Sequence, residues 1–141
     1  MTASGLLIGG RAVQVRGLTI TNQNDATWCC LRPADYRTRQ TTWVRGITVH
    51  TTGGNWPMPI SESPGPGGEC ERYADIWQSD PAHSAAHLVV DSRGSIACLA
   101  DIKYTCAYHA TSVNDVSVGI EMAQMKDGTV HRATIDATAR L

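Results

Sequence analysis

His50 is the first residue of this chain whose type and place suit it for chemistry. It lies in the segment Arg45–Gly54, which reads Arg-Gly-Ile-Thr-Val-His-Thr-Thr-Gly-Gly. With the period of two of a β-strand, the apolar Ile47 and Val49 face one side, and polar residues face the other: Thr48, His50 and Thr52. A neutral imidazole at the rigid end of a strand can ligate zinc or transfer protons. For this segment alone, the alternative is a histidine at a sheet edge that hydrogen-bonds to a neighbour.

Glu121 is the second candidate, and it lies in the most regular strand pattern of the sequence. Within Val116–Met122 the apolar residues alternate with Ser117, Gly119 and Glu121, so the carboxylate lies opposite the apolar side. A histidine metal ligand with a carboxylate that can deprotonate a metal-bound water is the minimum of a metallohydrolase. The structural alternative is a surface carboxylate that pairs with a lysine or arginine.

His109 is the third candidate, in an irregular segment shortly before Asn114. The alternative for His109 is a capping or loop histidine. His83 and His87 are spaced four apart, which on a helix would place both rings on one face. Pro81 and the strand expected just after it argue against a helix there, and no Glu follows His83 as the zincin pattern needs. We therefore do not predict a local zinc site at this pair.

The elements expected to position these residues are short. We predict strands over Trp43–His50, Ala86–Val90, Ser95–Ala100 and Val116–Met122, with a tight turn at 92–94 and a weak edge strand over Val13–Thr21. Prolines and glycines predict a loop over 55–68, and a loop of this length often borders a binding cleft.

Two helices are expected. Glu69–Ser79 carries acidic residues in its first turn, and Tyr73, Ile76 and Trp77 form one apolar stripe along it. Thr134 is expected to cap a second helix that begins at Ile135.

Composition limits the class of protein. With 141 residues, the chain is expected to form one domain. A net charge of −1 without blocks of like charge predicts neither a nucleic-acid nor a membrane partner. The low share of charged residues, 18%, together with 13 glycines suits a loop-rich α/β enzyme.

The N-terminus lacks a basic region before its short apolar core, so we expect synthesis in the cytoplasm without a signal peptide. The five cysteines are odd in number and form no Cys-x-x-Cys pair, which favours reduced thiols. Cys98, in an apolar run, is expected to be a small core residue.

Four segments, taken in order, resemble the type 2 N-acetylmuramoyl-L-alanine amidases, a family that includes phage endolysin amidases and peptidoglycan recognition proteins. No single segment is diagnostic, but their order and spacing together form a fairly specific signal. The similarity runs from about Trp43 to Leu141. The segments are Ile47–Thr52, Ser84–Ile96, Ala107–Ala110 and Asn114–Glu121.

This resemblance implies an α/β (α+β) fold, in which helices flank a central mixed sheet and a groove with one zinc binds the peptidoglycan muramyl-peptide. The reaction implied is hydrolysis of the amide between N-acetylmuramic acid and L-alanine, on the cell wall or its fragments. His50 matches the family's first zinc ligand. Glu121 matches the catalytic carboxylate of members that have Ser-Ala-His in the second segment, and Ala86 at that place excludes a tyrosine-assisted mechanism.

The resemblance also implies substrate-binding residues. His109 matches the histidine of a Trp-His-Ala-Gly segment that usually contacts the substrate, and Tyr108 replaces the tryptophan while keeping an aromatic wall. Asn114 and Thr51 are expected to bind the muramyl-peptide with them.

The family's other two zinc ligands, a His and then an Asp or Cys, follow the next helix and strand, and His131 lies too early to replace them. We therefore expect either a fragment of a longer amidase or a degenerate member that does not hold zinc. The expected single domain comprises an N-terminal extension, 1–42, and a core, 43–141, that lacks the last strand and helix. Self-association over an exposed sheet edge would be one way to stabilise it.

Two other functions stay open at this stage. One is a non-catalytic peptidoglycan-binding module that keeps the groove but not the metal. The other is an unrelated cytosolic metal-dependent hydrolase or a structural α/β domain.

Overall fold

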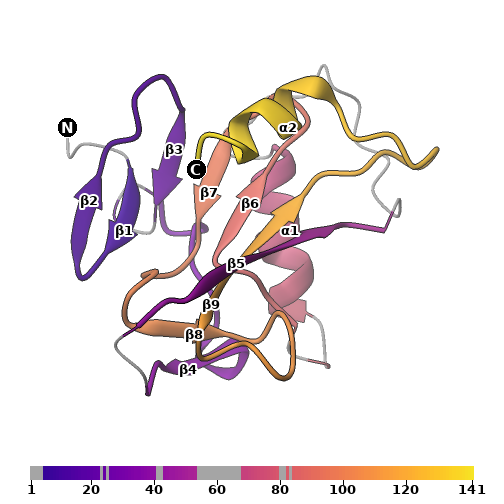
Figure 1. Cartoon of the computed structure of the whole chain (residues 1–141). Helices are drawn as coiled ribbons and strands as arrows, with labels where there is room; N and C mark the ends of the chain where they lie inside the picture. Colours follow the sequence, from indigo (N-terminus) through magenta and orange to yellow (C-terminus); the bar gives the residue numbers. More distant parts are fainter. Residues whose placement is uncertain are drawn as a thin grey trace.

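A central mixed sheet of five strands organises the chain (Figure 1). The computed structural model describes residues 5–22, 24, 26–40, 43–53, 68–79, 82 and 84–141. The antiparallel pair β6–β7 lies inside the sheet, and the other three neighbouring pairs are parallel. This arrangement confirms the predicted α/β class with a mixed sheet. In spatial order the strands are β3 (Ile20–Asn22), β7 (Ile96–Cys98), β6 (Leu88–Val90), β9 (Ser117–Met122) and β5 (Gly46–Thr51).

Two small antiparallel strand pairs and one short helix lie outside the central sheet. They are β1 (Leu6–Ile8) with β2 (Arg11–Val13), β4 (Tyr36–Thr38) with β8 (Thr105–Ala107), and the 3₁₀ helix η1 (Pro33–Asp35). The single edge strand predicted over Val13–Thr21 is wrong, because a turn divides that segment. In this turn Leu18 N–H donates to the Val15 carbonyl at 3.1 Å, and Gly17 has a φ of +72°.

Helices α1 (Glu69–Ser79) and α2 (Arg132–Thr138) cover opposite faces of the sheet (Figure 1). The α1 residues Cys70, Tyr73 and Ala74 pack on the face that carries Val89 and Ala97. On the other face, Ala137 of α2 packs with apolar side chains of β6, β7 and β9: Leu88, Val90, Ile96, Val118 and Ile120. The inner strands β6 and β7 therefore lie between two apolar layers.

The predicted bounds of α1 are confirmed, whereas the predicted start of α2 is wrong. Helix α2 begins at Arg132 with His131 as its N-cap residue. Thr134 lies inside the helix, fully buried, and its hydroxyl donates to the Asp91 carbonyl at 2.8 Å. The threonine thus ties α2 to the end of β6 instead of capping the helix.

The predicted hairpin of β6 and β7 is confirmed, although its strands are shorter than expected. Gly94 has a φ of +82°, and a Cβ there would lie 2.7 Å from the Ala133 carbonyl oxygen. A glycine is therefore required twice over, by the turn and by the close packing of α2.

Strand β5 is an edge strand, and among the described strands it pairs with β9 alone. The predicted alternation of its side chains is confirmed. Its apolar side is not covered, however, since Ile47 is 59% exposed and Val49 is 47% exposed. Most of the proline-rich segment predicted as a loop, 55–67, lies outside the described residues.

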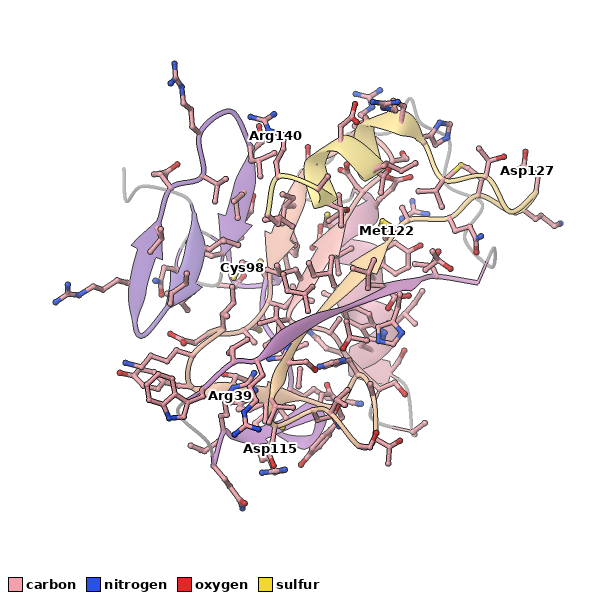
Figure 2. The ribbon with its side chains drawn as sticks, in the orientation of Figure 1. Arg39, Cys98, Asp115, Met122, Asp127 and Arg140 are labelled. Atoms are coloured by element: carbon pink, nitrogen blue, oxygen red, sulfur yellow. The ribbon has the colours of Figure 1, made fainter. Side chains whose placement is uncertain are left out.

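All five cysteines are free, and Cys98 is fully buried inside the sheet (Figure 2), as predicted for a core residue. No helix in the described part of the chain is both long and apolar enough to cross a membrane.

Asp91, in the turn that follows β6, makes stability depend on pH. Its Oδ1 accepts the N–H groups of Arg93 and Ser95 at 2.9 and 2.7 Å, while Oδ2 is buried without a partner in the described part of the chain. Burial raises the pKa of Asp91 from 3.8 to about 6. The folded state therefore binds more protons than the unfolded state between these values, and this stabilisation is lost as pH rises through the folded pKa.

We predict that Asp91→Asn removes this loss, because the amide keeps the Oδ1 acceptor without a charge. Relative to the wild type, the variant should gain on the order of 2 kcal/mol in free energy of unfolding between about pH 4 and about pH 8. Urea unfolding at both pH values measures the difference. An equal change in the free energy of unfolding of both proteins between the two pH values would contradict the role of Asp91.

Candidate active site

His50 and Glu121 lie side by side on one face of the sheet. They are direct register partners in the parallel pair of β5 and β9, so their side chains leave the sheet on the same side. The Nε2 atom of His50 is buried and has no hydrogen-bond partner among the described residues. His50 and Glu121, two separate candidates in the sequence, are therefore neighbours on one face of the sheet.

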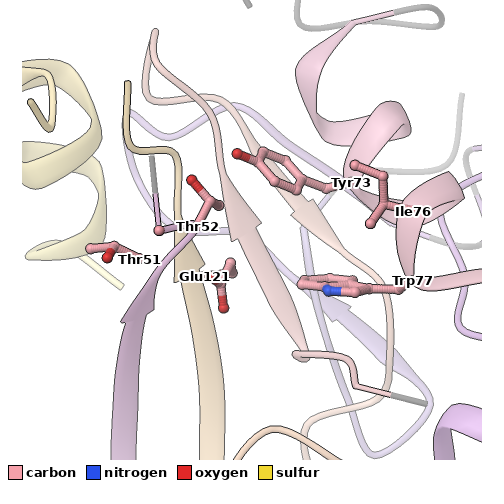
Figure 3. A pocket seen from close by; sticks show the side chains of 7 residues that line it. Thr51, Thr52, Tyr73, Ile76, Trp77 and Glu121 are labelled. Atoms are coloured by element: carbon pink, nitrogen blue, oxygen red, sulfur yellow. The ribbon is translucent and has the colours of Figure 1, made fainter. Parts of the chain in front are cut away.

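A pocket of about 360 Å³ opens beside Glu121 (Figure 3). Across from Glu121, helix α1 contributes one wall made of Tyr73, Ile76 and Trp77. The end of β5 contributes the other lining residues: Thr51, Thr52 and Gly53. The site is thus a largely apolar hollow with a carboxylate and hydroxyls along one side.

Burial raises the pKa of Glu121 from 4.5 to about 7. A carboxyl group with a pKa near neutrality can accept a proton and later donate it at the same pH. Glu121 is therefore suited to act as a general base and then as a general acid.

The two threonines at the end of β5 lie differently. Figure 3 shows the Thr51 side chain pointing away from Tyr73 and Trp77, whereas Thr52 and Glu121 point toward the α1 wall. The Thr51 hydroxyl donates to the Gln124 side chain at 3.2 Å. The Thr52 hydroxyl interacts with Tyr73, whose pKa is raised by burial. The structure thus brings Thr52 to the face that carries His50 and Glu121.

His109 is packed against Gly119 and contacts His50. The ring centroids of His50 and His109 are 5.8 Å apart in an edge-to-face arrangement. A Cβ at position 119 would lie 2.4 Å from His109 Cγ, so only glycine leaves room for the ring. Burial lowers the pKa of His109, and a hydrogen bond to Ser117 opposes this effect. The irregular segment thus brings His109 over β9, next to the His50–Glu121 pair.

Asn114 and Tyr108 hold the turn that carries His109. Asn114 Oδ1 accepts the N–H groups of His109 and Ala110 at 3.1 and 2.6 Å. The backbone of Tyr108 bonds to Asp35 and Ala85. The side-chain oxygen of Asn114 is therefore occupied by hydrogen bonds within the chain.

His87 is fully buried, and both of its ring nitrogens have partners. Its Nδ1 accepts the Gly119 N–H at 3.0 Å, and its Nε2 lies 3.0 Å from the Thr105 carbonyl oxygen. Burial lowers the pKa of His87 to about 4, so the ring stays neutral. His83, the other histidine of the pair considered in the sequence, lies outside the described residues, so the absence of a local zinc site there stays a prediction.

A metal ligand set is only partly present in what the structure describes. A catalytic zinc usually has three protein ligands. Within residues 5–22, 24, 26–40, 43–53, 68–79, 82 and 84–141, no group of three His, Cys, Asp or Glu side chains is placed to hold a metal ion. His50 fits the chemistry of one ligand, because its imidazole lies near the end of β5 on the same face of the sheet as Glu121.

The sequence did not predict that the apolar stripe of α1 lines a pocket. The spacing of Tyr73, Ile76 and Trp77 predicts one apolar stripe on the helix, and Tyr73 and Trp77 pack against the core on the α1 side of the sheet. The same residues also line the pocket. Their spacing signalled an apolar face, but only the placement of α1 beside the end of β5 shows what that face borders.

A family model described as N-acetylmuramoyl-L-alanine amidase matches residues 39–141. The chain belongs to this amidase family. A probable N-acetylmuramoyl-L-alanine amidase of Bacillus licheniformis is 28% identical to the chain over 101 residues. That alignment covers 70% of this chain and 28% of the Bacillus protein, so this chain spans little more than a quarter of the length of this relative.

A solved structure has the same fold as this amidase-family chain. The Drosophila peptidoglycan recognition protein (PGRP)-SA superimposes with a TM-score of 0.62 at 14% sequence identity. The superposition covers 86% of this chain and 68% of the Drosophila chain. At this identity the likeness shows the fold alone.

We predict that the Glu121 carboxyl titrates near pH 7 and that Trp77→Ala lowers this midpoint. Removing the indole admits water to the pocket, which weakens the burial that raises the pKa from 4.5 to about 7. Carbon-13 NMR of the carboxyl groups follows the titration directly. Trp43→Ala is the matched control, because Trp43 is 72% exposed and does not line the pocket. Equal midpoints in both variants would contradict the assigned cause.

Proposed function

We propose that this domain takes part in hydrolysis of the amide between N-acetylmuramic acid and L-alanine in peptidoglycan. The main support is the register of β5 and β9, which sets the imidazole of His50 beside the Glu121 carboxylate in a chain of the amidase family. A hydrolase of this class needs an imidazole ligand and a proton-transferring carboxylate on one side of a cleft.

Glu121 is the proposed catalytic residue. It takes a proton from the attacking water and delivers it to the leaving nitrogen of L-alanine, and its pKa of about 7 suits both steps. His50 is the proposed zinc ligand. When bound, zinc supplies a Lewis acid that polarises the scissile carbonyl and lowers the pKa of water. Ala86, which is buried, offers no tyrosine hydroxyl to assist.

The muramyl-peptide is proposed to lie along the pocket beside α1. His109, Asn114, Thr51 and Tyr108 are its proposed contacts, as the family resemblance implies. The apolar wall of α1 suits the methyl groups and sugar face of such a ligand, and the hydroxyl and carboxylate side suits its amides. The proposed place of action is the cell wall or its soluble fragments.

The alternative function is a peptidoglycan-binding module without catalysis. One observation favours it: the described residues hold no group of three side chains that could bind a metal ion. The module would keep the pocket and the wall of α1 and would use Glu121 only as a hydrogen-bond acceptor.

We predict that Glu121→Gln abolishes release of stem peptides from purified peptidoglycan while zinc content and folding stay unchanged. The amide cannot accept the proton of water, whereas its size and burial match those of the carboxyl. New L-alanine amino termini measure the reaction, and metal analysis measures zinc. Glu71→Gln, on α1 and outside the pocket, is the control of the same chemistry. Hydrolysis by the Glu121 variant would remove the carboxylate from this role.

A second measurement separates the enzyme from the binding module. We predict that the chain supplied with zinc both binds insoluble peptidoglycan and generates new amino termini. Sedimentation with peptidoglycan measures binding, and amino-group labelling measures product. Binding without zinc uptake and without product would favour the module instead.

A further inference from the structure

The site holds two buried imidazole nitrogens whose hydrogen-bonding capacity is unused within the described residues. One is Nε2 of His50 and the other is Nδ1 of His109. Buried polar atoms of this kind are rare in native proteins, so each needs an explanation. The two rings that carry them are neighbours in an edge-to-face arrangement with a centroid distance of 5.8 Å.

The contact of His109 Nε2 with Ser117 indicates which ring nitrogen of His109 carries the proton. Ser117 Oγ donates its hydrogen to the Val113 carbonyl oxygen at 2.7 Å, so toward His109 Nε2, at 3.3 Å, it acts as an acceptor. A neutral His109 must therefore carry its proton on Nε2. Its Nδ1 is then a lone pair that can only accept.

We propose that His109 is a positioning residue whose Nδ1 accepts a hydrogen bond from Nε2–H of His50. Two imidazoles joined by such a bond have ring centroids about 5 Å apart, from an N–H···N length near 2.9 Å and about 1.1 Å from each nitrogen to its ring centre. The observed 5.8 Å is within a small ring movement of that value. The bond satisfies both buried nitrogens at once.

The bond would fix which nitrogen of His50 serves a metal ion. Histidines that ligate metals nearly always donate their other ring N–H to an acceptor, which fixes the tautomer and the ring orientation. With Nε2–H given to His109, His50 presents Nδ1 as its lone pair. This step rests on the proposed function, because it takes His50 as the zinc ligand.

The surroundings of His109 are built to hold it in place. Its ring lies on Gly119, and Gly119 is itself fixed by two hydrogen bonds with His87, one from each backbone N–H. Arg39, only 7% exposed, donates to the carbonyl oxygens of Asn114, Asp115 and Ser117 on the segment that follows His109. Figure 2 shows Arg39 and Asp115 together at this end of the molecule.

The first test is the tautomer of His50, read by nitrogen-15 NMR of the metal-free chain near pH 8, with His50 and His109 assigned from alanine variants. The proposal expects both rings to carry the proton on Nε2 and expects His109→Ala to leave His50 as a mixture of tautomers. A His50 ring protonated on Nδ1 in the wild type, or unchanged in His109→Ala, would overturn it.

The second test is zinc affinity by calorimetry. His109→Ala should weaken zinc binding roughly 10- to 100-fold, as loss of such a partner typically does. His109→Asn should restore affinity to within about threefold, because Asn Oδ1 takes the place of Nδ1 as an acceptor. Equal affinities for wild type and His109→Ala, or no rescue by Asn, would overturn the proposal.

A matched pair of glycine variants tests whether the packing of His109 on Gly119 positions its ring. Gly119→Ala inserts a methyl group into the ring and should reproduce the effect of His109→Ala on the His50 tautomer. Gly46→Ala, on the neighbouring strand, adds a methyl group that meets nothing within 4 Å and should leave the tautomer unchanged. If Gly119→Ala does not fold, the His109 variants still test the hydrogen bond between His50 and His109. If the wild type binds no zinc, the zinc role of His50 fails, whereas the tautomer still decides the hydrogen bond.

Discussion

The site depends on the register of one parallel strand pair. A shift of β5 by one residue against β9 would turn His50 to the opposite face of the sheet and expose Ile47 or Val49 to the pocket. Because the pairing matches His50 to Glu121, two residues far apart in sequence leave the sheet as neighbours. Everything else in the site, from the α1 wall to the seat of His109, is arranged around this pair.

Burial has opposite effects on the two kinds of titratable group near that pair. It raises the pKa of Glu121 to about 7 and lowers the pKa of His87 to about 4, because in both cases it disfavours the charged form. The carboxyl is thereby left able to exchange protons near neutrality. The His87 imidazole is left neutral near pH 7, which suits its place between Gly119 and Thr105.

The parts of the fold that were predicted correctly have local causes. The bounds of α1 follow from acidic residues in its first turn and a helical apolar stripe, and the faces of β9 follow from strict alternation. The start of α2 was mispredicted because Thr134 bonds to Asp91, a residue distant in sequence. The pairing of His50 with Glu121 was expected from the family resemblance together with alternation. The contributions of Thr52 and Trp77 to the pocket depend on how α1 sits over β5, and no local pattern encodes that.

The position of β5 at the edge of the sheet determines what fraction of molecules has an assembled site. Among the described strands, β5 is hydrogen-bonded to β9 alone. Separation of these two strands would carry His50 away from Glu121, while β3, β7, β6 and β9 remain paired. Such partial openings cost less free energy than global unfolding. The fraction of molecules with an assembled site at any moment is therefore governed by the pairing of β5 with β9 and not by the melting temperature of the domain.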